Sequence, residues 1–125
     1  MAFIHEPIDL GYNDLTAVTA KSGRTYRDPA GNSYPSITTV LSILSREAIQ
    51  KWRARVGEEE ANRISSRASG RGTKVHNLLE KYVDNNPDYL KGEMPHNIQT
   101  FKDIQPTLDK CLTKVYAQEA PLYSE

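Results

Sequence analysis

The fold is constrained most by apolar residues that recur at helical spacing, with interruptions, between positions 36 and 83. The stretch PSITTVLSILS begins this pattern, with Ser36 as a good N-cap. A second helix, REAIQKWRARV, is predicted behind Ser45 and ends at Gly57. EEEANRISSRAS predicts a third helix whose acidic residues lie in the first turn, where the helix dipole favours them. These segments predict a mainly α chain.

Two glycines interrupt the pattern. The segment GRG at 70–72 predicts a break, after which Thr73 caps a fourth helix that ends before DNNPD. A polar linker then runs to about Pro95, and Pro106 predicts a kink or a new helix start further on. The apolar face of this last helical stretch is carried by Ile98, Phe101, Leu108, Leu112 and Val115.

The predicted β-structure is small. GRTYRDPAGNSYPS reads as a β-hairpin in which Tyr26 and Tyr34 flank a turn over 28–32, because proline presets φ and glycine supplies a left-handed position there. The first twenty residues have no sustained period, and APLYSE near the other end resembles the approach to a strand. We therefore expect an irregular N-terminal arm over 1–22 and a mainly helical domain over 23–125.

Overall composition excludes few functions. The 125 residues carry a net charge of zero, which favours neither nucleic acid nor membrane as a partner. No apolar run approaches the roughly 20 residues that span a bilayer, so a cytoplasmic protein without a membrane partner is expected. Charge is nevertheless uneven, because the segment 46–81 holds nine basic and five acidic residues, a net of +4. This segment is either a phosphate-binding track or an ordinary solvated surface.

The fourth predicted helix carries the most informative pair of residues. His76 and Glu80 are four residues apart, so they project from the same side of a helix. The imidazole of His76 can bind a metal, and the Glu80 carboxylate can bind a metal, a water or a neighbouring base. The alternative is that a single histidine on a helix is a surface residue, or one that supports a site without binding the metal itself.

Two predicted helix starts could bind phosphate. At the first, the free N–H groups of Thr73 and Lys74 and the charge of Arg71 suit an anion. At the second, YPSITT, the hydroxyl groups are those of Ser36, Thr38 and Thr39. A simply capped helix is the alternative for this second start, and it explains Ser36 fully.

The order YPSITTVLS…W…RGTKVHNLLEKY resembles the N-terminal half of the RecB-like branch of the PD-(D/E)XK nucleases, as found in phage exonucleases and the mitochondrial genome maintenance exonuclease. The resemblance runs from Tyr34 to Tyr82 and is weaker after Asn97. It implies an α/β, restriction endonuclease-like domain whose central sheet is largely missing here. It also implies a DNA exonuclease that uses Mg²⁺ or Mn²⁺, in a phage or in the cytoplasm of a bacterial host, with a role in DNA repair or recombination.

The resemblance also implies residue roles. His76 corresponds to the histidine metal ligand, and Glu80 supports the site from the next turn. Residues that hold the DNA backbone would be Arg71, Thr73, Lys74, Ser36, Thr38 and Thr39. Tyr34 is a candidate for stacking on a base or for packing in the core.

The chain lacks one part of this family's pattern. The family completes its metal site with an aspartate on one strand and an acid-x-lysine pair on the next, but no Asp or Glu here has Lys two positions later. We therefore expect a fragment, a truncated nuclease or one half of a split enzyme, inactive alone, with DNA and a C-terminal half in trans as partners. A non-catalytic DNA-binding module and a helical, partner-binding half of a split nuclease are the alternatives.

Overall fold

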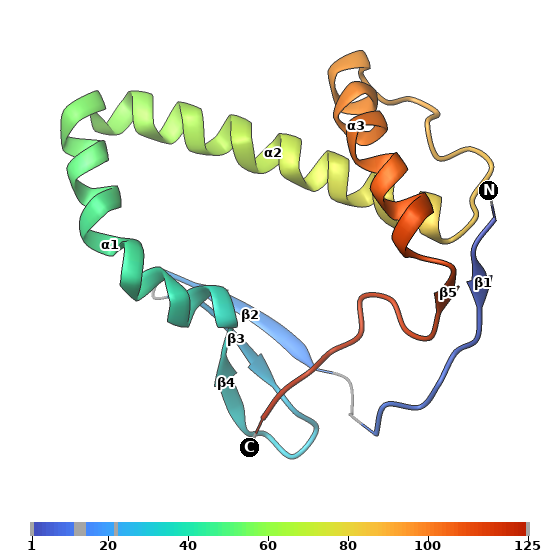
Figure 1. Cartoon of the computed structure of the whole chain (residues 1–125). Helices are drawn as coiled ribbons and strands as arrows, with labels where there is room; N and C mark the ends of the chain where they lie inside the picture. The colour runs from blue at the N-terminus through green and yellow to red at the C-terminus, as the bar shows by residue number, and fades with distance from the viewer. Residues whose placement is uncertain (1, 12–14, 22, 125) are drawn as a thin grey trace. The chain divides into compact units, whose positions relative to one another are not determined.

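The computed structural model describes residues 2–11, 15–21 and 23–124. The chain divides into two compact units. The helical unit consists of Met1–Ile8 and Asn62–Gln118, and the hairpin unit consists of Asp9–Ala61 and Glu119–Glu125. Figure 1 shows the course of the chain through the elements of both units.

The hairpin unit contains a three-stranded antiparallel sheet. Its strands are β2 (Thr16–Ala20), β3 (Gly23–Arg27) and β4 (Ser33–Pro35), in the order β2-β3-β4. The hairpin predicted over 23–36 is confirmed, with Tyr26 opposite Tyr34. The expectation of an irregular arm is wrong for Thr16–Ala20, because this segment pairs along its whole length with β3.

The turn between β3 and β4 is organised by one carboxylate. Asp28 Oδ1 accepts a bond of 2.9 Å from the Asn32 N–H, and Oδ2 accepts bonds of 3.0 Å from Asn32 Nδ2 and from the Tyr34 hydroxyl. These bonds lower the pKa of Asp28, with the Asn32 side chain the largest cause, because they stabilise the charged form. Gly31 takes a left-handed φ of 92° in this turn, as expected for glycine.

Helix α1 spans Ile37–Val56 without interruption. Ser36 is its N-cap and accepts a hydrogen bond from the Thr39 N–H, and Gly57 ends it with a φ of 91°. The separate helix predicted behind Ser45 is wrong. No helix-breaking residue lies there, and the Ser45 hydroxyl donates to the Ser42 carbonyl inside the helix.

Helix α2 spans Glu58–Val83 and passes through the segment 70–72. The predicted break and the predicted helix start at Thr73 are therefore wrong. Glycine in a helix costs only about 1 kcal/mol relative to alanine, and the residues on both sides propagate the helix. Gly70 and Gly72 are not among the residues with positive φ, so neither terminates a helix.

The helical unit also contains α3 (Pro95–Cys111) and a pair of short parallel strands, β1 (Ile4–His5) and β5 (Lys114–Val115). Pro106 lies inside α3, so it does not start a new helix. The expected apolar face is only partly right, because Leu112 caps the C-terminus of α3 and Val115 lies in β5. The segment APLYSE forms no strand over its described residues, 120–124.

The core of the helical unit forms where these elements meet. Phe101 is 1% exposed, and Leu78 is fully buried. Tyr82 contacts Phe3 and Phe101 edge-on, and its hydroxyl bonds the Asp109 carboxylate. The other buried members of the cluster are Val83 and Val115.

The N-terminal segment is held on this core by polar contacts with the end of α2. Asn85 accepts a bond from the Phe3 N–H at 2.7 Å and donates one to the Phe3 carbonyl at 2.8 Å. The His5 imidazole donates to the Val83 carbonyl at 2.7 Å.

The secondary structure of the described chain is mainly α-helical with short β-strands, as predicted. None of the helices in the described part of the chain combines the length and apolar character that crossing a bilayer requires.

Candidate nucleic-acid and metal site on helix α2

A groove of about 660 Å³ runs along α2 in the helical unit. Its lining combines three arginines with apolar and small residues, and we call it the arginine groove: Arg63, Ile64, Arg67, Ala68, Arg71, Gly72, Val75, His76, Leu79 and Thr100. The nine lining residues of α2 lie in two adjacent rows at intervals of four residues. Because residues at i and i+4 lie on one face of a helix, the three arginines share a face, and His76 belongs to the adjacent row.

The arginine groove has a cationic part and an apolar part. Arg63, Arg67 and Arg71 are exposed, each one helical turn beyond the last. Val75 continues the same row and is 8% exposed. At its Val75 end, the groove is therefore adjacent to the packed core. This combination suits an anionic ligand that also carries apolar surface.

Helix α3 positions the last of the three arginines. Arg71 Nη2 donates to Thr100 Oγ1 at 2.6 Å, and the Thr100 hydroxyl donates to the His96 carbonyl at 3.1 Å. An arginine has five N–H donors, so one bond to Thr100 leaves most of its donors for an anion. The contact restrains the side chain and therefore lowers the entropy cost of binding through it.

His76 and Glu80 lie together, as the sequence predicted. Their potential ligand atoms are within 4.8 Å of each other, with His76 exposed and Glu80 half-buried. Gln118 Nε2 donates to the Glu80 carbonyl at 3.0 Å, while its Oε1 is buried with no hydrogen-bond partner in the described structure. An imidazole and a carboxylate at this separation can bind one divalent cation, although Mg²⁺ needs about four further ligands, which waters or phosphate oxygens can supply.

Thr73 and Lys74 do not lie where the sequence placed them. Both are exposed residues in the middle of α2, and neither lines the arginine groove. Within a continuous helix their N–H groups belong to the helical hydrogen-bond ladder, so the proposed anion site at a helix start does not exist there. Arg71 still lines the candidate anion site, but only its side chain can bind an anion there.

Two groove residues, Arg63 and Arg67, were not identified as site residues from the sequence. The sequence does contain a signal for this row of arginines, because Arg63, Arg67 and Arg71 follow one another at intervals of four. The predicted break at 70–72 concealed it by assigning Arg71 to a different element from the other two.

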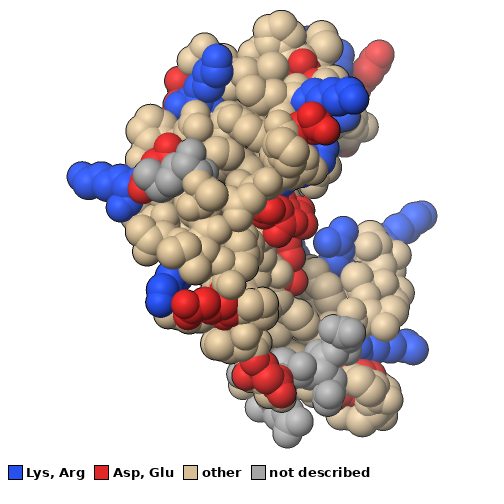
Figure 2. All heavy atoms as spheres, turned by 90° about the vertical axis from the view of Figure 1, so that its right-hand side faces the viewer, with Lys and Arg blue, Asp and Glu red and all other residues tan. Residues whose placement is uncertain are grey.

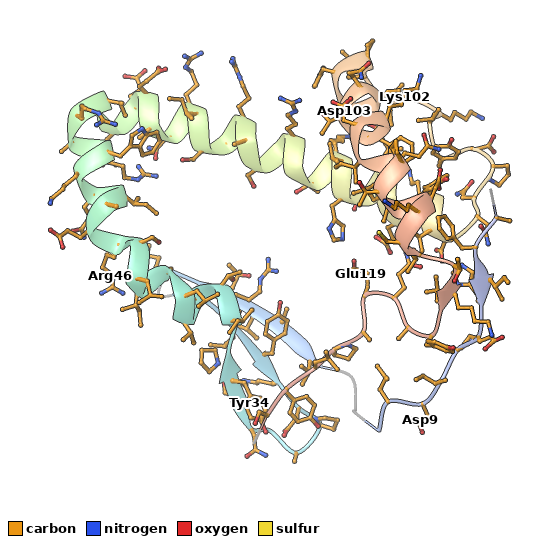
Figure 3. The ribbon with its side chains drawn as sticks, viewed as in Figure 1. Asp9, Tyr34, Arg46, Lys102, Asp103 and Glu119 are labelled. Atoms are coloured by element: carbon orange, nitrogen blue, oxygen red, sulfur yellow. The ribbon has the colours of Figure 1, made fainter. Side chains whose placement is uncertain are left out.

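The remaining candidate residues belong to the hairpin unit. Ser36 is 7% exposed, and its hydroxyl oxygen lies 3.1 Å from the Thr38 hydroxyl and 2.8 Å from that of Thr39. Capping therefore accounts for Ser36. Tyr34, labelled in Figure 3, donates to Asp28, and its ring centroid lies 5.2 Å from that of Tyr123. Tyr34, Ser36 and Thr38 line a second cavity of about 1180 Å³.

Charges of both signs occur on the face drawn in Figure 2. Basic and acidic side chains are interspersed there among uncharged ones. The arginine groove is thus a local concentration of positive charge in a protein with no net charge.

Comparisons of the chain with protein-family models, with curated proteins and with solved structures gave no match.

Proposed function

We propose that this chain is the DNA-binding and metal-ligating part of a metal-dependent DNA exonuclease of the RecB-like PD-(D/E)XK type. The observation that carries the proposal is the arginine groove, which is lined by three arginines and by His76. The sequence resemblance over Tyr34 to Tyr82 supports the same function from a separate direction.

The arginines would bind the DNA backbone. A four-residue step along a helix rises about 6 Å, so the three guanidinium groups form an extended row. Arginine binds phosphate through two parallel N–H bonds, and such contacts are independent of base sequence. Apolar groove residues such as Ile64 and Leu79 can contact sugars or bases beside the row.

His76 and Glu80 would hold the cation next to the bound backbone. A bound Mg²⁺ or Mn²⁺ would supply Lewis-acid activation of the phosphodiester and of a water. His76 would provide a nitrogen ligand to it and Glu80 an oxygen ligand. The acid-x-lysine pair that this family uses is absent from these 125 residues, so under this proposal the remaining catalytic groups lie outside them.

Salt-dependent DNA binding tests the first part of the proposal. Replacing Arg63, Arg67 and Arg71 together by glutamine should weaken binding of a labelled oligonucleotide, measured by fluorescence anisotropy. The slope of log affinity against log salt should fall by roughly 2–3, since each phosphate contact contributes about 0.7–0.9. The matched control replaces three lysines outside the groove, Lys91, Lys102 and Lys110, by glutamine. Equal losses in both triple variants would show that only net charge matters and would reject the groove.

Metal binding tests the second part without requiring catalysis. His76→Ala should weaken Mn²⁺ binding, followed by electron paramagnetic resonance, by at least 10-fold, because it removes a direct ligand. Glu80→Gln should have a smaller effect, and His96→Ala, at an exposed histidine of α3, should have none. Mn²⁺ affinity that is unchanged in His76→Ala would reject the metal assignment.

A non-catalytic DNA-binding module is the second candidate, favoured by the missing acid-x-lysine pair. The two functions differ in their response to metal. DNA binding that needs the arginines, together with no Mn²⁺ binding at His76, would favour the non-catalytic module.

A further inference from the structure

Strand β2 forms one edge of the sheet in the hairpin unit. It pairs only with β3 among the described residues, and all five of its side chains are exposed. Edge strands in natural proteins usually carry charges, a proline or a bulge that prevents pairing with another chain. The opposite edge, β4, is three residues long and ends in Pro35, whereas β2 has the uncharged sequence TAVTA.

The hydrogen-bonding groups of β2 that face away from β3 can be assigned from its register. Two residues separate β2 from β3, and Ala20 pairs with Gly23 beside that turn. The pair that flanks a two-residue turn is hydrogen-bonded, and bonded pairs alternate with non-bonded pairs along the strands. Ala17 and Thr19 therefore direct their N–H and C=O groups away from β3.

We propose that β2 pairs with β2 of a second copy of this chain, antiparallel and about a two-fold axis through Val18. In this register Ala17 of each copy lies opposite Thr19 of the other, and the two residues exchange both main-chain bonds. The outward groups of Ala17 and Thr19 in both copies are all satisfied, which gives four bonds. The product is a continuous six-stranded sheet.

The side chains of β2 are compatible with this register. Val18 meets Val18 of the second copy as a non-hydrogen-bonded pair, the type in which side chains approach most closely. Each threonine lies opposite an alanine, at both Thr16–Ala20 and Ala17–Thr19. No charged residue lies within the strand, so no like charges face each other. The pattern is self-complementary, as a two-fold interface requires.

The proposed interface is small, so the dimer is expected to be weak. A stable dimer buries roughly 800 Å² on each partner, and pairing of one five-residue strand contributes less than that. We therefore expect a monomer–dimer equilibrium in sedimentation runs between about 10 μM and about 1 mM. A monomer at about 1 mM would overturn the proposal, as would open-ended assembly, which a closed two-fold pair excludes.

Matched variants locate the interface. Val18→Lys places two like charges opposite each other at the axis and should abolish the dimer. Val40→Lys is its control, because Val40 in α1 is 46% exposed and Val18 is 42% exposed. A dimer that survives Val18→Lys but is lost in Val40→Lys would place the interface on α1 and overturn the proposal.

Two further variants separate pairing from folding. Ala17→Pro removes an N–H that faces away from β3, so it should prevent dimer formation while circular dichroism stays that of the parent. Val18→Cys, in a Cys111→Ser background, should form a symmetric disulfide dimer on mild oxidation. Val40→Cys in the same background should form far less. Equal cross-linking of the two cysteine variants, or a dimer that persists in Ala17→Pro, would contradict the strand pairing.

Discussion

At the scale of single residues, Asp28 contributes more to the stability of the hairpin than its place in a turn suggests. Its two carboxylate oxygens accept three hydrogen bonds, from the Asn32 backbone, the Asn32 side chain and the Tyr34 hydroxyl. A charged acceptor forms stronger bonds than a neutral one. The turn between β3 and β4 therefore depends on the ionised state of one side chain.

Asp28→Asn should destabilise the hairpin unit at neutral pH and make its stability less sensitive to acid. The pKa of Asp28 is lowered in the folded chain, chiefly by the Asn32 side chain. A lowered folded pKa gives stability that is present above the unfolded pKa, about 3.9, and is lost as pH falls through the folded value. Thermal melts from pH 7 to pH 2 should show the difference between parent and variant shrinking below about pH 4.

Asp103→Asn is the control for this experiment, because Asp103 is an exposed carboxylate on α3 that accepts one bond from Gln99. It should leave the melting curves close to those of the parent at neutral pH. If the difference between the parent and Asp28→Asn is as large at pH 2 as at pH 7, the charge of Asp28 contributes nothing to the turn.

At the scale of elements, the continuity of α2 determines the candidate site. A break at 70–72 would separate Arg71 from Arg63 and Arg67, and the three would no longer share a face. The continuous helix of 26 residues keeps them in one row. Two glycines in its interior make this helix weaker than its length suggests, because each costs about 1 kcal/mol relative to alanine.

Replacing Gly70 or Gly72 by alanine should therefore stabilise the protein by about 0.5–1 kcal/mol each. Apart from the adjoining residues and the backbone of α2 itself, no atom lies within 4 Å of where the new Cβ would be at either position. Urea unfolding followed by circular dichroism at 222 nm measures the change. Gly57→Ala is the opposite control and should destabilise, since Gly57 has a φ of 91° at the end of α1. Destabilisation by the substitutions at 70 and 72 would mean that the helix is broken there.

At the scale of the whole molecule, buried apolar side chains are distributed unequally between the two units. The helical unit has a contiguous core around Leu78 and Phe101. In the described hairpin unit the buried residues are Ala61, Asp28 and Ser36, and α1 has none. Helix α1 instead exposes large apolar residues: Ile37, Val40, Leu41, Ile43, Leu44 and Ile49. Burial of apolar surface is the main source of stability, so the helical unit should be the more stable.

Hydrogen exchange of the parent and of Phe101→Ala tests this predicted difference in stability between the two units. In the parent, amides of α3 and of residues 75–83 should exchange more slowly than those of α1, because α1 opens locally. The variant should lose about 3–5 kcal/mol of stability and raise exchange in the helical unit. Amides of α1 should change little. Equal protection of α1 and α3 in the parent, or parallel acceleration of both in the variant, would contradict the predicted difference.

Local interactions let the sequence determine several features of this protein by itself. Ser36 begins a helix and Gly57 ends one, because a cap bond and a positive φ involve only neighbouring residues. The turn over 28–32 followed from proline and glycine for the same reason. The i, i+4 spacing of His76 and Glu80 placed them together once a helix was predicted, and the apolar period identified Phe101 as a core residue.

Other features were decided only by the tertiary structure. Strand β1 pairs with β5 across more than a hundred residues, and β2 exists because β3 lies beside it. The free energy of such pairing depends on neighbours that are distant in the sequence. The row of Arg63, Arg67 and Arg71 depends on a helix that continues through Gly70 and Gly72. Glycine raises the local cost of a helix but does not forbid one, so the outcome depends on what the residues on both sides contribute through packing.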